Sequence, residues 1–248
     1  MHHLLAFEEA VGTVADTDLD AITDDIVTIQ NSHFFPSQDL KLVWAFACGA
    51  TIDRAKIVTP MLRQITPPFI RPVNLGAAPI SQQDVADYSE YPFQLRRNEE
   101  IAVELTSAIA MGTEQSFALL GVTQGLMPVP QGDIFTIRGT STTAGVANTW
   151  VTTAMTWADT LPEGRYAVVG LDVVGAVEIA ARLIFEEQTW RPGCVGNVLV
   201  SNQAPSIFRK GRLGVWGQFN NYAFPQVQIL NTTTTAVHTA YMDLIRVG

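Results

Sequence analysis

Short runs in which apolar and polar residues alternate recur along most of the chain, and this pattern constrains the fold most strongly. In the clearest run, 101–106, Ile, Val and Leu share one face while Ala, Glu and Thr share the other. Similar runs between Gly, Pro, Asn and Asp clusters predict strands at Leu40–Phe46, Lys56–Met61, Gln115–Val122, Asp133–Ile137, Val151–Trp157, Arg165–Leu171, Ala180–Phe185, Arg212–Phe219, Gln226–Leu230 and Thr239–Val247. So many short strands predict an all-β sandwich or barrel.

Helical signals are few and short. The best is Ser81–Asp84, which resembles a capping box and leads into Val85–Tyr88. We therefore expect few short helices, confined to loops.

The two halves of the chain resemble each other in sequence. Pro36–Val58 aligns without gaps on Pro162–Ile184, at an offset of 162 − 36 = 126. Two further matches follow in the same order: Arg71-Pro72 with Gly76 recurs as Arg191-Pro192 with Gly196, and Ala118–Val122 resembles Asp243–Val247. The common order favours an internal duplication. Chance similarity in a chain rich in Val and Ala is the alternative.

A Gly- and Pro-rich stretch, Thr123–Gly132, lies just after the first half's last predicted strand. It predicts a domain at 1–127, with an N-terminal arm over 1–25, and a second domain at 128–248. Each would hold about eight strands, which is the size of a jelly roll.

Charge and hydropathy exclude several classes of function. The 248 residues carry a formal net charge of −9, which is the wrong sign for a protein that grips nucleic-acid phosphates. No apolar run approaches the roughly 20 residues that span a bilayer, and the N-terminus lacks the pattern of a secretory signal. Cys48 and Cys194 match no metal or redox spacing, so we expect two buried thiols.

Candidate metal-binding residues fit a structural role better than a chemical one. Asp16, Asp18 and Asp20 have the opening spacing of a calcium loop, but Ala21 replaces the turn Gly and Val27 the closing Glu. A solvated acidic segment is the favoured interpretation. His33 and His238 have no second ligand at metal spacing and form no His-x-His cluster of the cupin kind, so ordinary loop or strand histidines are expected.

Paired carboxylates and aromatic residues are further candidates for a catalytic or binding site. Neighbouring residues on a strand point to opposite faces, so Glu8-Glu9, Glu99-Glu100 and Glu186-Glu187 predict solvated strand ends rather than a glycosidase site. The large aromatic residues could form a sugar-binding platform or pack inside the protein, and their alternation with polar residues favours packing. They are Trp44, Trp150, Trp157, Trp190, Trp216, Phe208, Phe219 and Phe224. The sequence predicts no catalytic residue, no metal, no cofactor and no enzyme activity.

The second half resembles a known family. The segments LPEGRYAVVGL (161–171), ARLIFEEQTWRPG (181–193), WGQFNNYAFPQVQIL (216–230) and the closing YMDLIRVG are similar to the second barrel of small double jelly-roll capsid proteins. The resemblance implies two tandem jelly rolls and a major capsid protein of a tailless icosahedral prokaryotic virus.

The same resemblance implies the partners and the location. Three copies would form a pseudo-hexagonal homotrimer that contacts neighbouring capsomers, penton and minor capsid proteins and, in some members, an internal membrane. The protein would be made in the host cytoplasm and act in the virion, without sequence-specific nucleic-acid binding. The alternative is a trimeric carbohydrate- or receptor-binding sandwich of the spike or lectin kind.

Overall fold

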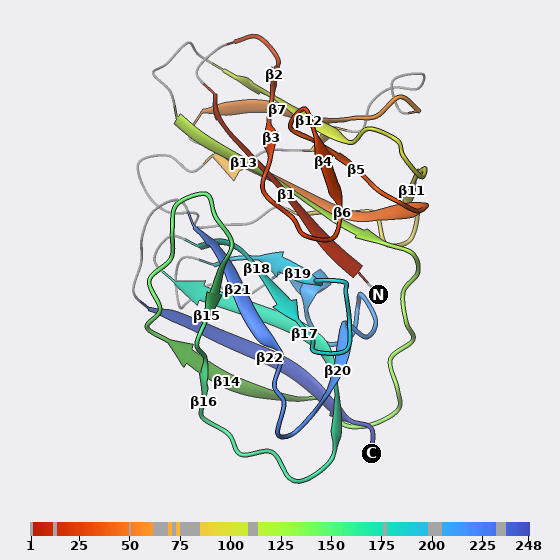
Figure 1. Ribbon diagram of the computed structural model, residues 1–248, viewed down its shortest axis with the longest axis vertical. Coiled ribbons are helices and arrows are strands. Elements are labelled where there is room, and N and C mark those ends of the chain that lie inside the picture. Colours follow the sequence, from red (N-terminus) through yellow and green to blue (C-terminus); the bar gives the residue numbers. More distant parts are fainter. Residues whose placement is uncertain are drawn as a thin grey trace. The chain divides into compact units, whose positions relative to one another are not determined.

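The computed structural model describes residues 2–11, 14–49, 51–61, 69–70, 73–74, 85–108, 114–175, 178–197, 205–231 and 237–248. The expected fold class is confirmed in its broad form, because the chain is all-β and its sheets are largely antiparallel (Figure 1). Within the described ranges, the helical content is one 3₁₀ turn, η2 (Ser206–Phe208).

The chain divides into two compact units. The first unit is Leu5–Gln124, and the second unit is Gly125–Gly248 together with Met1–Leu4. The division after Gln124 lies within the Gly- and Pro-rich stretch singled out in the sequence, three residues before the expected boundary. The assignment of the first residues to the second unit has no counterpart in the sequence analysis.

The expected N-terminal arm, residues 1–25, includes a strand of the sandwich. Residues His2–Val11 form strand β1, which lies between β13 and β3 in the larger sheet of the first unit. The side chains from His2 to Phe7 are all buried, so this part of the segment is packed inside the protein. Its sequence, HHLLAFEEAV, does not alternate, which is why the period-two pattern missed it.

Two sheets and a hairpin make up the first unit. The larger sheet contains β10 (Ala86–Asp87), β6 (Leu40–Gly49), β13 (Glu114–Thr123), β1 and β3 (Asp20–Ala21) in that order, with β11 (Phe93–Leu95) and β9 (Val73–Asn74) also pairing with β6. The smaller sheet runs β2 (Thr17–Asp18), β12 (Ala102–Ser107), β7 (Ile52–Val58), β8 (Phe69–Ile70). The hairpin is β4 (Thr28–Gln30) with β5 (His33–Phe35).

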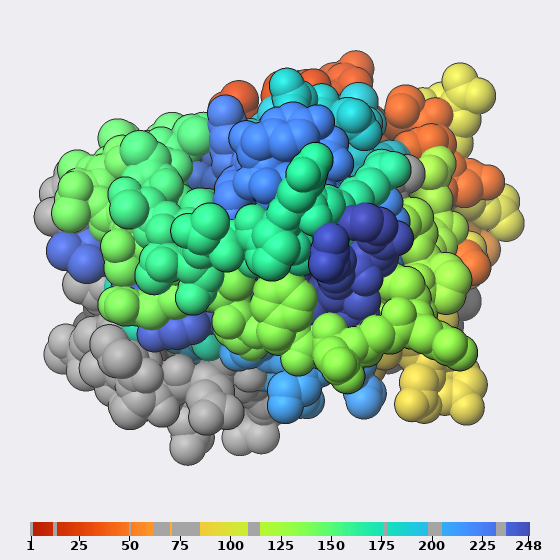
Figure 2. Space-filling view, turned by 90° about the horizontal axis from the view of Figure 1, so that it is seen from below, coloured from red at the N-terminus to blue at the C-terminus, as the bar shows by residue number. Residues whose placement is uncertain are grey.

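The second unit also contains two sheets. One runs β16 (Thr156–Trp157), β14 (Phe135–Ser141), β22 (His238–Arg246), β17 (Arg165–Gly175), β20 (Gly217–Asn220). The other runs β15 (Val151–Thr153), β21 (Gln226–Asn231), β18 (Glu178–Ile184), β19 (Gly193–Val195). The chain after β22 pairs with the start of β17, since the Arg165 amide donates to the Gly248 carbonyl at 2.7 Å, and both segments reach the surface seen in Figure 2.

Residues at the start of β1 complete the second unit. The Leu4 amide donates to the Arg191 carbonyl at 3.0 Å, and the His2 ring lies edge-on to Trp216 with centroids 5.6 Å apart. His3 lies in the same way against Trp190, also at 5.6 Å. Burial lowers the pKa of His2 to about 3, so its ring is neutral at neutral pH.

One β-bulge interrupts each of the two long pairings in the first unit. On β6, Trp44 pairs with Gly121 and Leu42 with Val122, so Val43 is the extra residue. On β7, Arg54 pairs with Thr106 and Ile52 with Ser107, which leaves Asp53 extra.

The second unit has bulges at the corresponding places. Val169 is the extra residue where β17 pairs with β22, and Ile179 is the extra residue where β18 pairs with β21. The offsets from Val43 and Asp53 are 169 − 43 = 126 and 179 − 53 = 126. Both equal the offset of the gapless alignment, so the described residues aligned between 36–58 and 162–184 occupy equivalent positions in the two units. The expected match of Ala118–Val122 with Asp243–Val247 is wrong in register, because Val122 pairs with Leu42 and Leu244 pairs with Val168, the equivalent of Leu42.

One local expectation is wrong. Ala86–Asp87 form strand β10, paired with β6, in place of the helical turn expected at Val85–Tyr88. The edge of β6 offers unpaired backbone groups at this point, and pairing with them replaces the local helical preference. The capping residues Ser81–Asp84 and the repeated Arg71-Pro72 with Gly76 lie outside the described residues.

Candidate functional site

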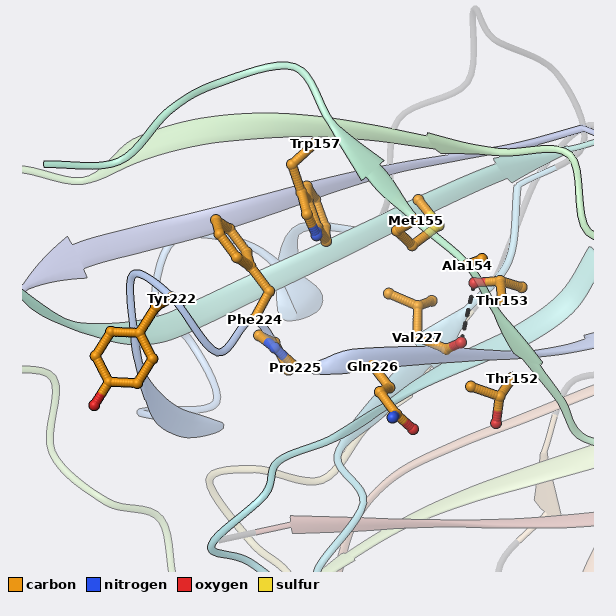
Figure 3. A pocket seen from close by; sticks show the side chains of 10 residues that line it. All are labelled: Thr152, Thr153, Ala154, Met155, Trp157, Tyr222, Phe224, Pro225, Gln226 and Val227. Carbon is orange, nitrogen blue, oxygen red and sulfur yellow. Dashed lines mark hydrogen bonds between the residues drawn. The ribbon is translucent and has the colours of Figure 1, made fainter. Parts of the chain in front are cut away.

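A groove opens at the edge of the second unit, where the chain crosses from one sheet to the other. β15 pairs with β21, but β16 pairs with β14 in the opposite sheet, so the chain changes sheet at Ala154 and Met155. The volume of the groove is about 560 Å³ (Figure 3). Its lining residues are Thr152, Thr153, Ala154, Met155, Trp157, Tyr222, Phe224, Pro225, Gln226 and Val227.

Stacked aromatic side chains form one wall of the groove. The Trp157 and Phe224 rings are nearly parallel, with an angle of 18° and centroids 5.5 Å apart. Gly139 lies beneath the indole, because a Cβ there would come within 2.6 Å of Trp157. Phe224 also contacts Phe219 at 5.1 Å, which ties the wall to the core. The two rings of this wall are therefore packed against other residues of the second unit.

Tyr222 projects on the other side of the loop, away from the stacked pair (Figure 3). Its side chain is 81% exposed. The Asn220 side-chain amide donates to its hydroxyl at 3.1 Å and holds the ring in place. An exposed, oriented aromatic ring provides a contact surface for a binding partner.

The polar groups of the groove are neutral. The Thr153 hydroxyl donates to the Val227 carbonyl at 3.0 Å, and the Thr152 hydroxyl accepts from Gln228 Nε2 at 3.1 Å. Gln226 is exposed, and its side-chain amide points below the strand in the view of Figure 3. No side chain among the ten lining residues carries a charge at neutral pH.

Two residues of this groove, Trp157 and Phe224, are among the aromatic residues for which the sequence favours packing over a sugar-binding platform. Both rings pack, and both also line the groove. Thr152, Tyr222 and Gln226 were missed because exposed residues in and beside a loop follow no periodic pattern. The one available signal in the sequence was the position of Tyr222, directly after two Asn residues and before an Ala.

A buried ion pair lies elsewhere in the second unit. Arg209 donates through Nε and Nη2 to the Asp243 carboxylate at 2.7 and 2.8 Å, and the Thr136 hydroxyl and Lys210 amide also donate to it. Burial raises the pKa of Asp243, but these four hydrogen bonds outweigh it and hold the pKa below the ordinary 3.8. The pair fastens the loop after η2 onto β22, which is a structural role.

His238 is not an ordinary strand histidine. It is fully buried, its Nε2 lies 2.8 Å from the Thr143 carbonyl, and its Nδ1 bonds to Glu178. Because a carbonyl only accepts, Nε2 is the donor of the first of these bonds. Among the described residues, Glu178 Oε2 and both amide atoms of nearby Asn231 form no hydrogen bond.

The other sequence candidates are dispersed. Asp16 accepts from Arg54 and Lys56 at 2.7 and 2.6 Å, so it belongs to a surface ion-pair cluster and not to a calcium loop. Hydrogen bonds from Lys56 above all hold the pKa of Asp16 well below its usual range. His33 Nδ1 pairs with Glu100 at 2.5 Å.

Glu8 and Glu9 are half-buried inside β1, and Glu99 also differs from expectation. Glu99 is not a solvated strand end, because it is buried and accepts the Met61 and Arg96 amides at 2.7 and 2.8 Å. The chain after β7 is thereby fixed to the turn before β12. Glu99 thus satisfies two backbone donors.

The described part of the chain contains neither a metal-binding cluster nor a membrane-spanning helix. There, no group of three or more His, Cys, Asp or Glu side chains is arranged to hold a metal ion. No helix in the same ranges has the length and apolar character needed to cross a bilayer. Cys48 and Cys194 are both free and buried, and burial raises the pKa of each thiol.

Comparison with known proteins gives one structural match. No family model matches the sequence, and no curated protein sequence matches it. The major capsid protein P2 from bacteriophage PM2 is similar over 100% of this chain and 98% of that chain, with 11% identity and a TM-score of 0.25. A TM-score this low does not establish a shared fold or function.

Proposed function

We propose that the chain is a viral shell protein built from two jelly rolls that arose by duplication. The observation that carries the proposal is that both units share one strand order and have bulges at the same offset of 126. A duplicated sandwich is the simplest way for a single chain to present two similar building blocks.

The strand order of each unit is that expected of a jelly roll. Eight strands of the second unit, numbered along the chain from β14 with β16 set aside, give sheets 1-8-3-6 and 2-7-4-5. The first unit gives the same two orders when β1, β2, β6, β7, β8, β11, β12 and β13 are numbered one to eight. Eight strands in two such sheets correspond to a double Greek key.

The duplication gives the proposed assembly a geometric basis. A trimer of a chain with two equivalent sandwiches presents six similar sides, so it can pack as a pseudo-hexagon and tile a closed shell. The sequence resemblance to double jelly-roll capsid proteins points the same way. We propose a homotrimer that contacts neighbouring capsomers in a virion, with penton and minor capsid proteins and an internal membrane as further candidate partners.

The test is the size of the assembled protein. Purified chain, examined by mass photometry and negative-stain electron microscopy at increasing concentration, is expected to form trimers of 3 × 27.0 kDa and then shells. A protein that remains monomeric at every concentration and salt condition would rule out the shell function. The alternative, a carbohydrate- or receptor-binding trimer, would stop at the trimer.

A further inference from the structure

We propose that the groove of the second unit binds a neutral oligosaccharide. This inference goes beyond shell assembly and does not depend on it, because the groove is formed by one copy of the second unit alone. Its volume of about 560 Å³ falls within the roughly 300–1,000 Å³ typical of small-ligand sites.

The aromatic residues match the faces of sugar rings. A pyranose presents C–H groups on its faces, and these are attracted to the electron-rich face of an aromatic ring. Tyr222 offers such a face at 81% exposure, with its hydroxyl fixed by Asn220. Trp157 and Phe224 add an apolar wall that is already packed against Gly139 and Phe219.

The polar residues match the edges of sugar rings. Sugar hydroxyls both donate and accept hydrogen bonds, and the Gln226 amide supplies both functions from an exposed position. The Thr152 hydroxyl accepts from Gln228, so its own proton remains for an acceptor on a ligand. Side chains of this kind, interspersed with aromatic ones, give orientation and specificity.

The charge of the groove selects against other ligands. None of its lining side chains is cationic, so it offers no partner for a phosphate, sulfate or carboxylate. The net charge of −9 disfavours anionic ligands further. An uncharged, hydroxyl-rich ligand therefore fits the groove better than a nucleotide or an acidic glycan.

The experiment has two arms that separate immobilised glycans from free sugars. The full chain is applied to an array of neutral, sialylated and sulfated oligosaccharides, and saturation-transfer NMR then measures binding of free neutral oligosaccharides in solution. We expect binding to neutral oligosaccharides in both arms. Binding on the array alone would identify a surface-displayed glycan as the source of the ligand, still within the proposal.

Single substitutions test whether the groove is the binding site. Tyr222→Ala and Gln226→Ala each remove an exposed contact, and each is expected to weaken binding about tenfold. Ala154→Tyr fills the groove without deleting a packing residue and is expected to abolish binding. The matched control is Tyr91→Ala in the first unit, where the tyrosine is 85% exposed and binding should not change.

Three results would overturn the proposal. They are no binding to any neutral oligosaccharide, binding restricted to anionic ones, and neutral binding that survives all three groove variants. None of these results bears on trimer or shell formation, which is measured by particle size. Failure of the sugar site and failure of the shell function are therefore distinguishable.

Discussion

At the scale of single residues, the two units fill equivalent positions in opposite ways. Trp44 on β6 pairs with Gly121, and its indole occupies the space where a glycine Cβ would be. The equivalent of Trp44 is Gly170, since 44 + 126 = 170, and Gly170 pairs with Asp243. The side chain that occupies the space beside the glycine thus comes from β6 in the first unit and from β22 in the second.

Gly121→Ala tests this packing. The new Cβ would lie 1.9 Å from Trp44 Nε1, and Trp44 is buried with no free space to move into. We expect the free energy of unfolding of the first unit to fall by about 2 kcal/mol, as for other overpacked cores. Denaturant unfolding measures this change. Gly125→Ala is the control, because nothing lies within 4 Å of its Cβ, and an equal loss there would contradict the explanation.

Asp243→Asn tests the buried ion pair and its pH dependence. Loss of the charge leaves Arg209 with only its longer 3.6 Å ion pair to Asp172 among the carboxylates described here, and we expect roughly 3 kcal/mol less stability at pH 7. The pKa of Asp243 lies below its unfolded value of 3.8, so its contribution is complete above that pH and is lost as the pH falls through the folded pKa. Unfolding curves of variant and parent should converge in that acid range.

The control for this variant is an exposed carboxylate of the same unit. Asp133→Asn changes the same chemical group at an exposed position, so the free energy of unfolding of this variant should change with pH as that of the parent does. If Asp133→Asn and Asp243→Asn lowered the stability equally, the four hydrogen bonds to Asp243 would not be the cause of the loss.

At the scale of elements, period-two patterning predicted most long strands but not all of their ends. The run at Leu40–Phe46 became β6, which continues to Gly49, and Ala180–Phe185 became β18, which begins at Glu178. The pattern failed at β1, which is buried on both faces. It also could not locate the groove, which depends on a crossing between sheets that pairs residues far apart in sequence.

Deleting a bulge residue tests the register. Removal of Asp53 leaves Ile52 and Arg54 facing Ser107 and Thr106 in regular pairing, so the rest of β7 keeps its orientation. Removal of Ala55 instead shifts every later residue of β7 by one and turns Lys56 toward the core. We expect a cooperative thermal transition for the Asp53 deletion and none for the Ala55 deletion. Equal behaviour of the two would refute the assigned register.

At the scale of the whole molecule, the division into units passes through β1. Leu4 belongs to the second unit and Leu5 to the first, and both side chains are 0% exposed. Leu4 packs so closely on Gly193 that a Cβ there would lie 2.4 Å from its Cδ2. Two adjacent and equally buried leucines therefore report on different units.

Leu4→Ala and Leu5→Ala should destabilise different parts of the chain. Each substitution removes buried methyl groups and is expected to cost about 3 kcal/mol. Amide hydrogen exchange should accelerate in β17 and β18 for Leu4→Ala, and in β6 and β13 for Leu5→Ala. Acceleration in the same strands for both variants would show that the chain does not divide after Leu4.

The place of the final strand bears on how the protein is made. In the second unit, β22 lies between β14 and β17, although it is the last of these strands to leave the ribosome. Until it arrives, β14 and β17 have unpaired edges, and such edges recruit other chains. Translation that pauses before residue 238 would thus leave an aggregation-prone intermediate, and a chaperone that covers these edges would raise the yield of folded protein.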